Sequence, residues 1–163
     1  MEPTSRKYLF FDLDGTLTDS MPGIARAVQY ALRRFGIDVQ DLAALKPFLG
    51  PPLRDSFMEF YGMSPEEADR AVAVSREYFV PRGMFENELY PGIPELLAAT
   101  AAAGRVNVIA TSKPQPFAER IAAHFGIDRH FRLISGSTFD GRRKTKADVI
   151  RHALSALGIA PDE

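Results

Sequence analysis

Three short apolar runs, separated by helical patterns, limit the fold classes that are open to this chain. The runs cover residues 7–11, 106–110 and 131–135, and each ends at polar or glycine residues. Short apolar runs of this kind are typical of strands in a parallel sheet that helices cover on both faces. We therefore predict an α/β fold with a parallel, Rossmann-like sheet.

The segments between these runs carry the start and stop signals of helices. Ser64-Pro-Glu-Glu67 combines an N-cap serine, a proline at the first helical position and a glutamate at the third, so a helix should run from here to about Val80. Further helical patterns, each followed by a glycine, cover residues 24–35, 93–103, 116–125 and 145–157.

Residues 21–89 contain no convincing strand, although they separate the first predicted strand from the second. Such a stretch is too long for an ordinary crossover between parallel strands. We expect it to form an all-helical cap that is inserted after the first strand. Residues 1–20 and 90–163 would then form the α/β core.

Charge and composition exclude several classes of partner. The formal net charge is -1 without a basic block, so we expect no nucleic-acid partner, and no apolar stretch is long enough to cross a bilayer. The chain has no cysteine, which rules out disulfides and thiolate metal sites. The amino-terminal residues lack the features of a signal peptide. We expect a cytoplasmic protein, either a monomer or a homodimer.

Two carboxylates follow the first apolar run directly. Asp12 comes at its end, and Asp14 and Gly15 follow after one intervening residue. In an open α/β sheet Asp12 would lie at the carboxyl end of its strand, where ligands bind. Asp14-Gly15 is also a common turn pair, so a hairpin remains an alternative. A calcium loop is disfavoured because Leu17 stands where that loop requires glycine.

Two carboxylates about 4 Å apart repel each other by roughly 4 kcal/mol at an effective dielectric constant of 20. A bound divalent cation would offset that repulsion, and Mg2+ suits a site that offers only oxygen ligands. Such a site suits phosphoryl transfer, in which one carboxylate attacks phosphorus and a second carboxylic acid protonates the leaving oxygen.

Phosphate-binding candidates stand after the second predicted strand and at the start of the last helix. Thr111-Ser112-Lys113-Pro114 follows the strand, and its hydroxyl and N–H groups would face the same crevice, although Thr111 or Ser112 could equally cap the next helix. Lys146 opens the last helix, where the helix dipole disfavours a cation. It would hold the nucleophile and the phosphate, or else lie on the solvated surface.

These segments resemble the motifs of a known family. Asp12-Leu-Asp-Gly-Thr-Leu-Thr-Asp19 is similar to the first motif of the haloacid dehalogenase-like phosphohydrolases, Thr111-Ser112 to the second and Lys146 to the third. The helical insert matches the cap of that family. Phe48-Leu-Gly-Pro-Pro-Leu53 and the run from Gly136-Ser137 through Asp140-Gly141 to Lys146 resemble the phosphoglycolate phosphatase-like branch.

The resemblance implies a role for each matching residue. Asp12 would be the nucleophile that forms an aspartyl-phosphate, and Asp14 would be the general acid and then the base. The Asp12 carboxylate and the Asp14 backbone carbonyl would bind Mg2+. The remaining residues expected to contact phosphate or substrate are Gly15, Thr16, Thr111, Ser112, Lys113 and Lys146. Thr16 implies a phosphatase, since this position differs in many sugar-phosphate mutases of the family.

The family has a fourth motif, an acidic Gly-Asp pair with a further aspartate, after the next strand of the sheet. This sequence ends at Gly158-Ile-Ala-Pro-Asp-Glu163, where that strand would begin. The resemblance therefore implies a core that is truncated at its carboxyl end and a Mg2+ site that lacks one carboxylate.

The expected function is Mg2+-dependent hydrolysis of small phosphate monoesters such as phosphoglycolate. The alternatives are a 5′-nucleotidase or a sugar-phosphate phosphatase that uses the same site, or a catalytically impaired protein that only binds phosphorylated ligands. Arg54, in the cap, would read an anionic or polar group on the substrate, or else be an exposed helix-terminal arginine. We expect His124, His130 and His152 at the surface, because their spacing does not form a metal site.

Overall fold

A computed structural model describes residues 6–160 of the chain. The chain divides into two compact units, one combining Met1–Leu17 with Leu89–Glu163 and the other formed by Thr18–Glu88. The inserted unit therefore begins three residues before the predicted cap and ends one residue earlier.

The core unit contains a three-stranded parallel sheet in the order β1-β4-β5, with β1 at Tyr8–Phe11, β4 at Val106–Pro114 and β5 at Phe131–Ser137. These are the three strands that the apolar runs predict, and the α/β fold class is confirmed. The strands are parallel, so their carboxyl ends meet at one edge of the sheet.

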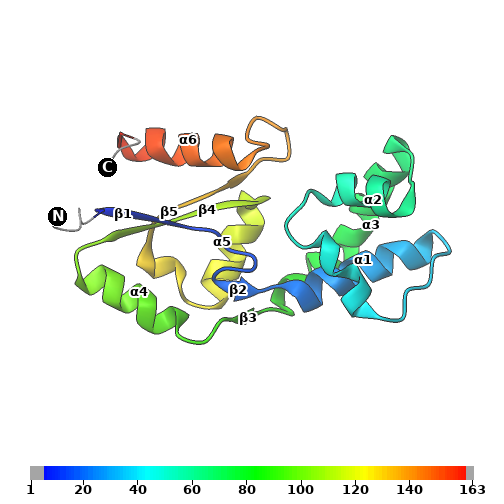
Figure 1. The fold of residues 1–163 in the computed structure, drawn as a ribbon, viewed down its shortest axis with the longest axis horizontal. Helices are drawn as coiled ribbons and strands as arrows, with labels where there is room; N and C mark the ends of the chain where they lie inside the picture. Colours follow the sequence, from blue (N-terminus) through cyan, green and yellow to red (C-terminus); the bar gives the residue numbers. More distant parts are fainter. Residues whose placement is uncertain (1–5, 161–163) are drawn as a thin grey trace. The chain divides into compact units, whose positions relative to one another are not determined.

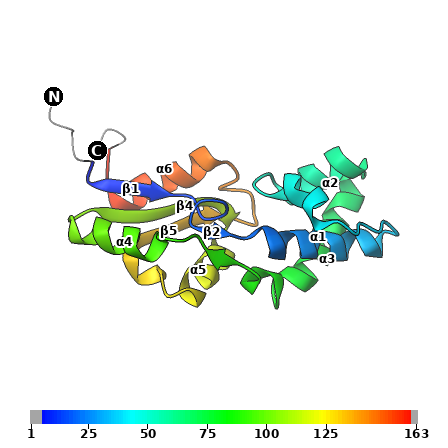
Figure 2. The ribbon, with the colours of Figure 1, turned by 60° about the horizontal axis from the view of Figure 1, so that its bottom comes forward.

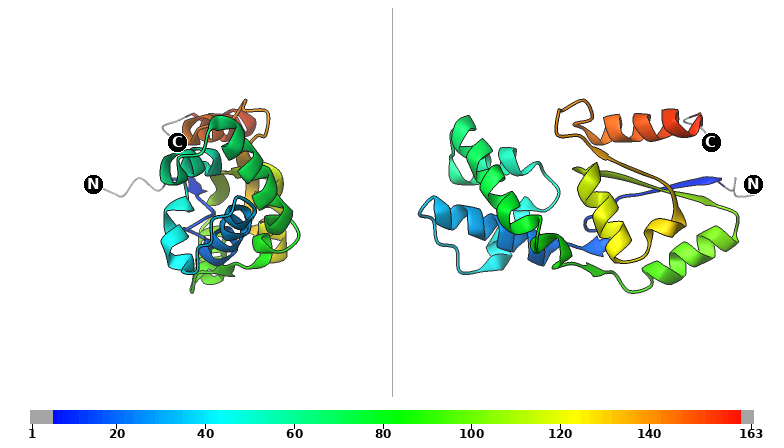
Figure 3. Two further views of the ribbon diagram at one scale, coloured as in Figure 1. Left: turned by 90° about the vertical axis from the view of Figure 1, so that its right-hand side faces the viewer. Right: turned by 180° about the vertical axis from the view of Figure 1, so that it is seen from behind.

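Helices cover both faces of this sheet. Helix α6 (Lys146–Leu157) lies on one face, and α4 (Ile93–Ala102) and α5 (Gln115–His124) lie on the other (Figures 1 and 2). The view from behind shows the same arrangement (Figure 3). A short 3-10 helix, η3 (Asp128–His130), leads from α5 into β5. Each predicted helix of the core is present, with ends that differ by one residue or a few.

Strand β4 runs four residues further than the sequence predicts, because it contains a bulge. Ala110 pairs with Ser135 and Pro114 pairs with Ser137, so four steps along β4 match only two along β5. The extra residues between these pairs include Thr111, Ser112 and Lys113. The predicted phosphate-binding segment is therefore a bulge within a strand, and bulges often aim side chains at a site.

The inserted unit contains α1 (Met21–Arg34), η1 (Leu42–Phe48), α2 (Leu53–Tyr61), α3 (Pro65–Phe79) and η2 (Gly83–Phe85). Its helices pack around buried side chains that include Leu32, Phe48 and Phe57. The capping box predicted at Ser64 is confirmed: the Ser64 hydroxyl accepts from Glu67 N, and the Glu67 carboxylate accepts from Ser64 N.

Short strands β2 (Thr18–Asp19) and β3 (Glu88–Leu89) pair with each other where the chain enters and leaves this unit. The sequence predicts neither, since each has only two residues. Because β1 pairs with β4 and not with β2, the hairpin alternative for Asp14-Gly15 is wrong. Within the described residues no helix combines the length and the apolar character that crossing a membrane requires.

Candidate active site

Asp12 and Lys146 form an ion pair at the carboxyl end of β1. Asp12 follows the last residue of β1, and its Oδ2 lies 2.6 Å from Nζ of Lys146, the first residue of α6. The other oxygen, Oδ1, accepts a hydrogen bond of 2.8 Å from Leu13 N. Lys146 Nζ also donates to the carbonyl oxygen of Ala110 at 3.1 Å. Both charged side chains are about two-fifths exposed, so the pair is accessible to a ligand.

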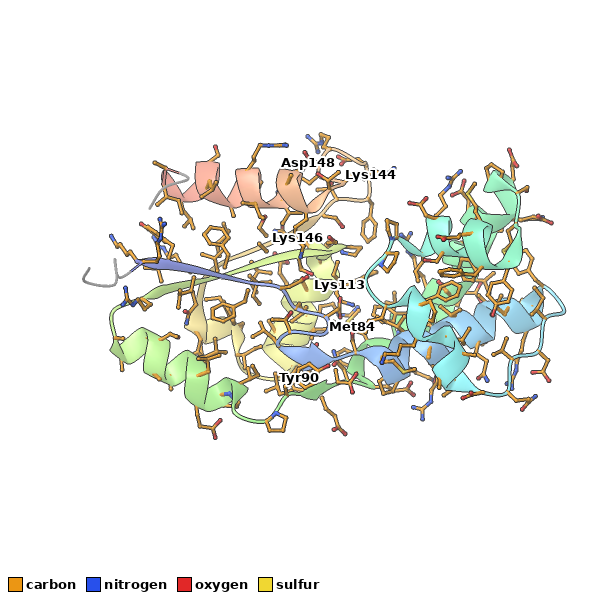
Figure 4. The ribbon with its side chains drawn as sticks, in the orientation of Figure 1. Met84, Tyr90, Lys113, Lys144, Lys146 and Asp148 are labelled. Carbon is orange, nitrogen blue, oxygen red and sulfur yellow. The ribbon has the colours of Figure 1, made fainter. Side chains whose placement is uncertain are left out.

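Asp14 and Lys113 form a second ion pair, which is more deeply buried. Lys113 Nζ lies 3.1 Å from Asp14 Oδ2, and the two side chains are 6% and 15% exposed. No described residue donates a hydrogen bond to Asp14 Oδ1, which is also buried. Lys113 and Lys146 come from β4 and α6 and both lie near the carboxyl end of β1 (Figure 4). We expected Lys113 to contact substrate, whereas the structure places it against Asp14.

Two buried leucines hold the turn that follows β1 and carries Asp14. Leu13 and Leu17 are fully buried, and Leu17 N donates to Leu13 O at 2.9 Å. Gly15 has φ +75, a conformation that favours glycine, and it closes the turn directly after Asp14. Gly15 and Thr16 are exposed in this turn. The chain therefore anchors the turn with leucines while Gly15 and Thr16 stay accessible.

The bulge in β4 carries the second group of candidate residues. Thr111 is 1% exposed, and its Oγ1 accepts a hydrogen bond of 3.2 Å from Lys113 N, whereas Ser112 is exposed. The N-cap of α5 is Pro114, without a side-chain cap, so neither Thr111 nor Ser112 caps this helix. Both residues are therefore free of the capping role that the sequence left open.

Because Gly136 on β5 has no side chain, the backbone at the end of the β4 bulge lies unusually close to the backbone of β5. A Cβ added to Gly136 would lie 2.5 Å from Gln115 Cα, 2.6 Å from Gln115 N and 2.7 Å from Lys113 O. Arg143, in the loop after β5, contacts the same end of the bulge: its Nη2 donates a hydrogen bond of 2.7 Å to Gln115 Oε1. No local pattern in the sequence indicates this role of Gly136 and Arg143, because it depends on contacts between distant segments.

A magnesium ion fits the charges and oxygens of this site. With both aspartates ionised, as in their two ion pairs, Asp12, Asp14, Lys113 and Lys146 sum to zero charge, so a phosphate dianion would leave the site at about -2 before Asp14 takes up a proton, and one divalent cation would neutralise that charge. Mg2+ commonly binds through one or two carboxylates together with substrate phosphate and water. Among residues 6–160 no group of three or more histidine, cysteine or acidic side chains could hold a metal ion by itself. The repulsion between Asp12 and Asp14, which suggested a bound cation from the sequence, is already offset by Lys113 and Lys146. The fit of Mg2+ to this site therefore rests on the available oxygen ligands and on the charge balance with bound phosphate.

Arg54 belongs to the inserted unit and is engaged there. Its Nε donates to Asp69 Oδ1 at 2.7 Å, and its Nη1 lies 3.5 Å from Met58 Sδ. The side chain is 42% exposed. The structure shows an ion pair on the surface of the unit, and a contact of Arg54 with substrate stays a prediction.

The three histidines expected at the surface differ in exposure, and His152 also makes a buried contact. His124 is exposed, and His130 is intermediate. His152 is also intermediate, and its Nδ1 lies 2.9 Å from Oγ of the fully buried Ser135. Burial, followed by the charge of Arg143, lowers the pKa of His152 from its usual value. His152 stands three residues after the buried Val149, so the helical repeat places it toward the inner side of α6, and this spacing is the signal in the sequence.

The model of the haloacid dehalogenase-like hydrolases matches residues 7–163. A 5′-nucleotidase from Pseudomonas aeruginosa is 51% identical over 154 residues, covering 94% of this chain and 70% of the relative. The tyrosine-protein kinase PtkA of Mycobacterium tuberculosis is 40% identical over 158 residues, covering 97% of this chain and 54% of the relative. A phosphoglycolate phosphatase from Yersinia pestis is 34% identical over 158 residues, covering 91% of this chain and 66% of the relative.

Among solved structures, a predicted phosphatase from Clostridium acetobutylicum superimposes with a TM-score of 0.91 at 48% identity, covering 96% of this chain and 72% of that one. The chain belongs to the haloacid dehalogenase-like hydrolase family. Its relatives confirm the phosphoglycolate phosphatase-like branch, and those named here include a 5′-nucleotidase and a phosphoglycolate phosphatase. The chain spans about half the length of the Mycobacterium relative and about two thirds of the others.

Proposed function

We propose that this chain carries the catalytic groups of a Mg2+-dependent phosphatase that hydrolyses small phosphate monoesters through an aspartyl-phosphate at Asp12. The observation that carries the proposal is the pairing of two aspartates, separated by one residue, with two lysines from different elements. This arrangement combines a nucleophile, a proton carrier and cations for phosphate in one place, and the family membership supports the same chemistry.

In the first step, a carboxylate oxygen of Asp12 forms a bond to phosphorus as the bond between phosphorus and the alcohol oxygen breaks. Asp14, which takes up a proton when the substrate binds, gives that proton to the departing oxygen. In the second step, a water oxygen attacks phosphorus, its proton passes to Asp14, and the bond to Asp12 breaks. The enzyme returns to its starting state, with alcohol and inorganic phosphate as the products.

Cations and N–H groups hold the phosphate oxygens during both steps. Lys146 already lies on Asp12 and would neutralise the equatorial oxygens beside it. The Thr111 hydroxyl accepts from Lys113 N, which leaves its hydrogen free to donate to phosphate, and the Ser112 amide would add a second donor. Bound Mg2+, held by the Asp12 carboxylate and the Asp14 carbonyl, would supply further charge neutralisation.

The proposed substrates are small phosphorylated metabolites, and two kinds are supported to different degrees. The 5′-nucleotidase relative is 51% identical, whereas the phosphoglycolate phosphatase relative is 34% identical. Nucleoside 5′-monophosphates therefore rank before phosphoglycolate as first substrates to test. A comparison of kcat/KM for the two, measured with the same preparation, decides between them.

The test of the proposal is phosphate release by the purified chain with Mg2+ and p-nitrophenyl phosphate. Release should vanish in Asp12→Asn, and Asp14→Asn should slow turnover of an alkyl phosphate by about 10²–10⁴-fold, the usual loss for a general acid and base. Release that persists in Asp12→Asn would refute the aspartyl-phosphate. Thermal stabilisation by phosphate or vanadate without any release would support a protein that only binds phosphorylated ligands.

A further inference from the structure

Ser135 connects strand β5 to helix α6 through a buried hydrogen bond. Ser135 is fully buried, and its Oγ donates to the backbone oxygen of Val149 at 2.9 Å. Val149 stands three residues after Lys146 in the same helix, one turn away from the cation of the site. The Ser135 hydroxyl is therefore attached to the part of α6 that carries Lys146.

His152 completes this connection from the next turn of the helix. Its Nδ1 lies 2.9 Å from Ser135 Oγ. A serine hydroxyl has one hydrogen, and that hydrogen is used on Val149 O. The imidazole must therefore donate, which places the hydrogen of the neutral ring on Nδ1 and leaves Nε2 without one. Since the doubly protonated ring also donates from Nδ1, the connection does not depend on the charge of His152.

The first turn of α6 is then held to the sheet at two neighbouring points. Lys146 Nζ donates to Ala110 O on β4, and Val149 O accepts from Ser135 on β5. Ala110 and Ser135 are paired partners in the sheet. Apolar packing of Val149 and Ala153 holds the helix against the sheet but is not directional, whereas hydrogen bonds fix its register along the sheet.

We infer that Ser135 and His152 are positioning residues, which set the register of α6 so that Lys146 Nζ reaches both Asp12 and the transferred phosphate. This inference rests on the proposed function, since it takes Lys146 to be a phosphate-binding cation. Neither residue contacts Asp12 or Lys146 directly, so both act through the helix.

The first test is the tautomer of His152, which needs no activity. Nitrogen-15 NMR of the full chain at pH 7.5, where the lowered pKa leaves the ring neutral, should show hydrogen on Nδ1 and none on Nε2. Assignment of the resonance comes from its loss in His152→Asn. Hydrogen on Nε2, or an even mixture of the two tautomers, would overturn the connection to Ser135.

The second test compares phosphate affinity, measured by calorimetry with inorganic phosphate and Mg2+, across matched variants. Ser135→Ala and His152→Leu should each weaken phosphate binding by about tenfold, the factor that corresponds to the loss of roughly one hydrogen bond. His152→Asn, which keeps an N–H donor near the position of Nδ1, should retain most of the affinity. The controls are Ser155→Ala, at an exposed site on α6, and His124→Leu, at an exposed site on α5.

A structural role alone predicts a different pattern. If Ser135→Ala and His152→Leu lower the melting temperature but leave the phosphate affinity of the folded protein unchanged, the positioning role is refuted. Failure of the proposed function would show instead as phosphate binding without hydrolysis by the unmodified chain, while the tautomer and the affinity differences remain measurable. The two failures are therefore distinguishable.

Discussion

Replacing Gly136 by alanine should displace the bulge of β4 and lower the activity of the folded protein. The added Cβ would meet Gln115 Cα at 2.5 Å, whereas ordinary contacts begin at 3.4 Å, so the two backbones must separate by about 0.9 Å. Both groups in this contact are backbone, so no side-chain rotation relieves it. The shift would move Thr111 and Lys113 relative to Asp12.

A displacement of about 1 Å in a catalytic site can cost on the order of 10²-fold in rate. Overpacking of this kind costs about 1–3 kcal/mol in stability. We therefore expect kcat/KM of Gly136→Ala for p-nitrophenyl phosphate to fall roughly 10²-fold. Steady-state kinetics, carried out well below the melting temperature of each variant, measures this effect on folded protein.

Gly104→Ala is the matched control. Gly104 has φ +70 at the end of α4, and a Cβ there would meet nothing within 4 Å. The substitution should cost a similar amount of stability, about 1–2 kcal/mol, through backbone strain alone. Equal loss of activity in the two variants, or full activity in Gly136→Ala, would refute the argument that close approach at Gly136 positions the bulge.

Three further predictions concern charges. Lys113→Met should lower the free energy of unfolding in denaturant by about 3 kcal/mol, because it leaves the Asp14 carboxylate buried without its partner. Adding Asp14→Asn should recover part of that loss, and strictly additive effects of the two changes would argue against coupling. Arg54→Ala should raise KM for carboxylated phosphate esters more than for p-nitrophenyl phosphate, and equal effects would remove its role in selectivity. A hydrogen bond from Thr145 N, followed by one from the Thr145 hydroxyl, lowers the pKa of Asp148 from 3.8 to about 2. The contribution of ionised Asp148 to stability is therefore present above about pH 4 and is lost as the pH falls toward 2. Thermal melts from pH 7 to pH 3 should therefore show a smaller decrease in Asp148→Asn than in the unmodified chain, and identical decreases would contradict this.

Local signals in the sequence predicted most of the fold. The capping box at Ser64 formed as expected, and so did the helix that Gly158 ends, because caps depend on residues only a few positions apart. The three strands followed from their apolar runs. The extension of β4 to Pro114 was not predicted, because it depends on pairing with β5 across a bulge.

The sequence pointed to individual residues of the candidate site, but it did not predict all of the side-chain contacts between them. The sequence pointed to Asp12 and Lys146, which the structure brings within 2.6 Å of each other. It did not predict that Lys113 pairs with Asp14, or that Ser135 and His152 meet. These contacts join residues on different elements, and nothing in the local pattern of a single sequence records which distant side chain lies opposite.

The most direct measurement of the central claim is detection of the phosphorylated intermediate. The chain would be incubated with Mg2+ and a labelled phosphate monoester, quenched with acid, and digested for mass spectrometry of the peptide that contains residues 8–20. We predict one phosphoryl group on Asp12, absent in Asp12→Asn. Hydrolysis that proceeds with no phosphorylated peptide, or with phosphate on any other residue, would contradict the account.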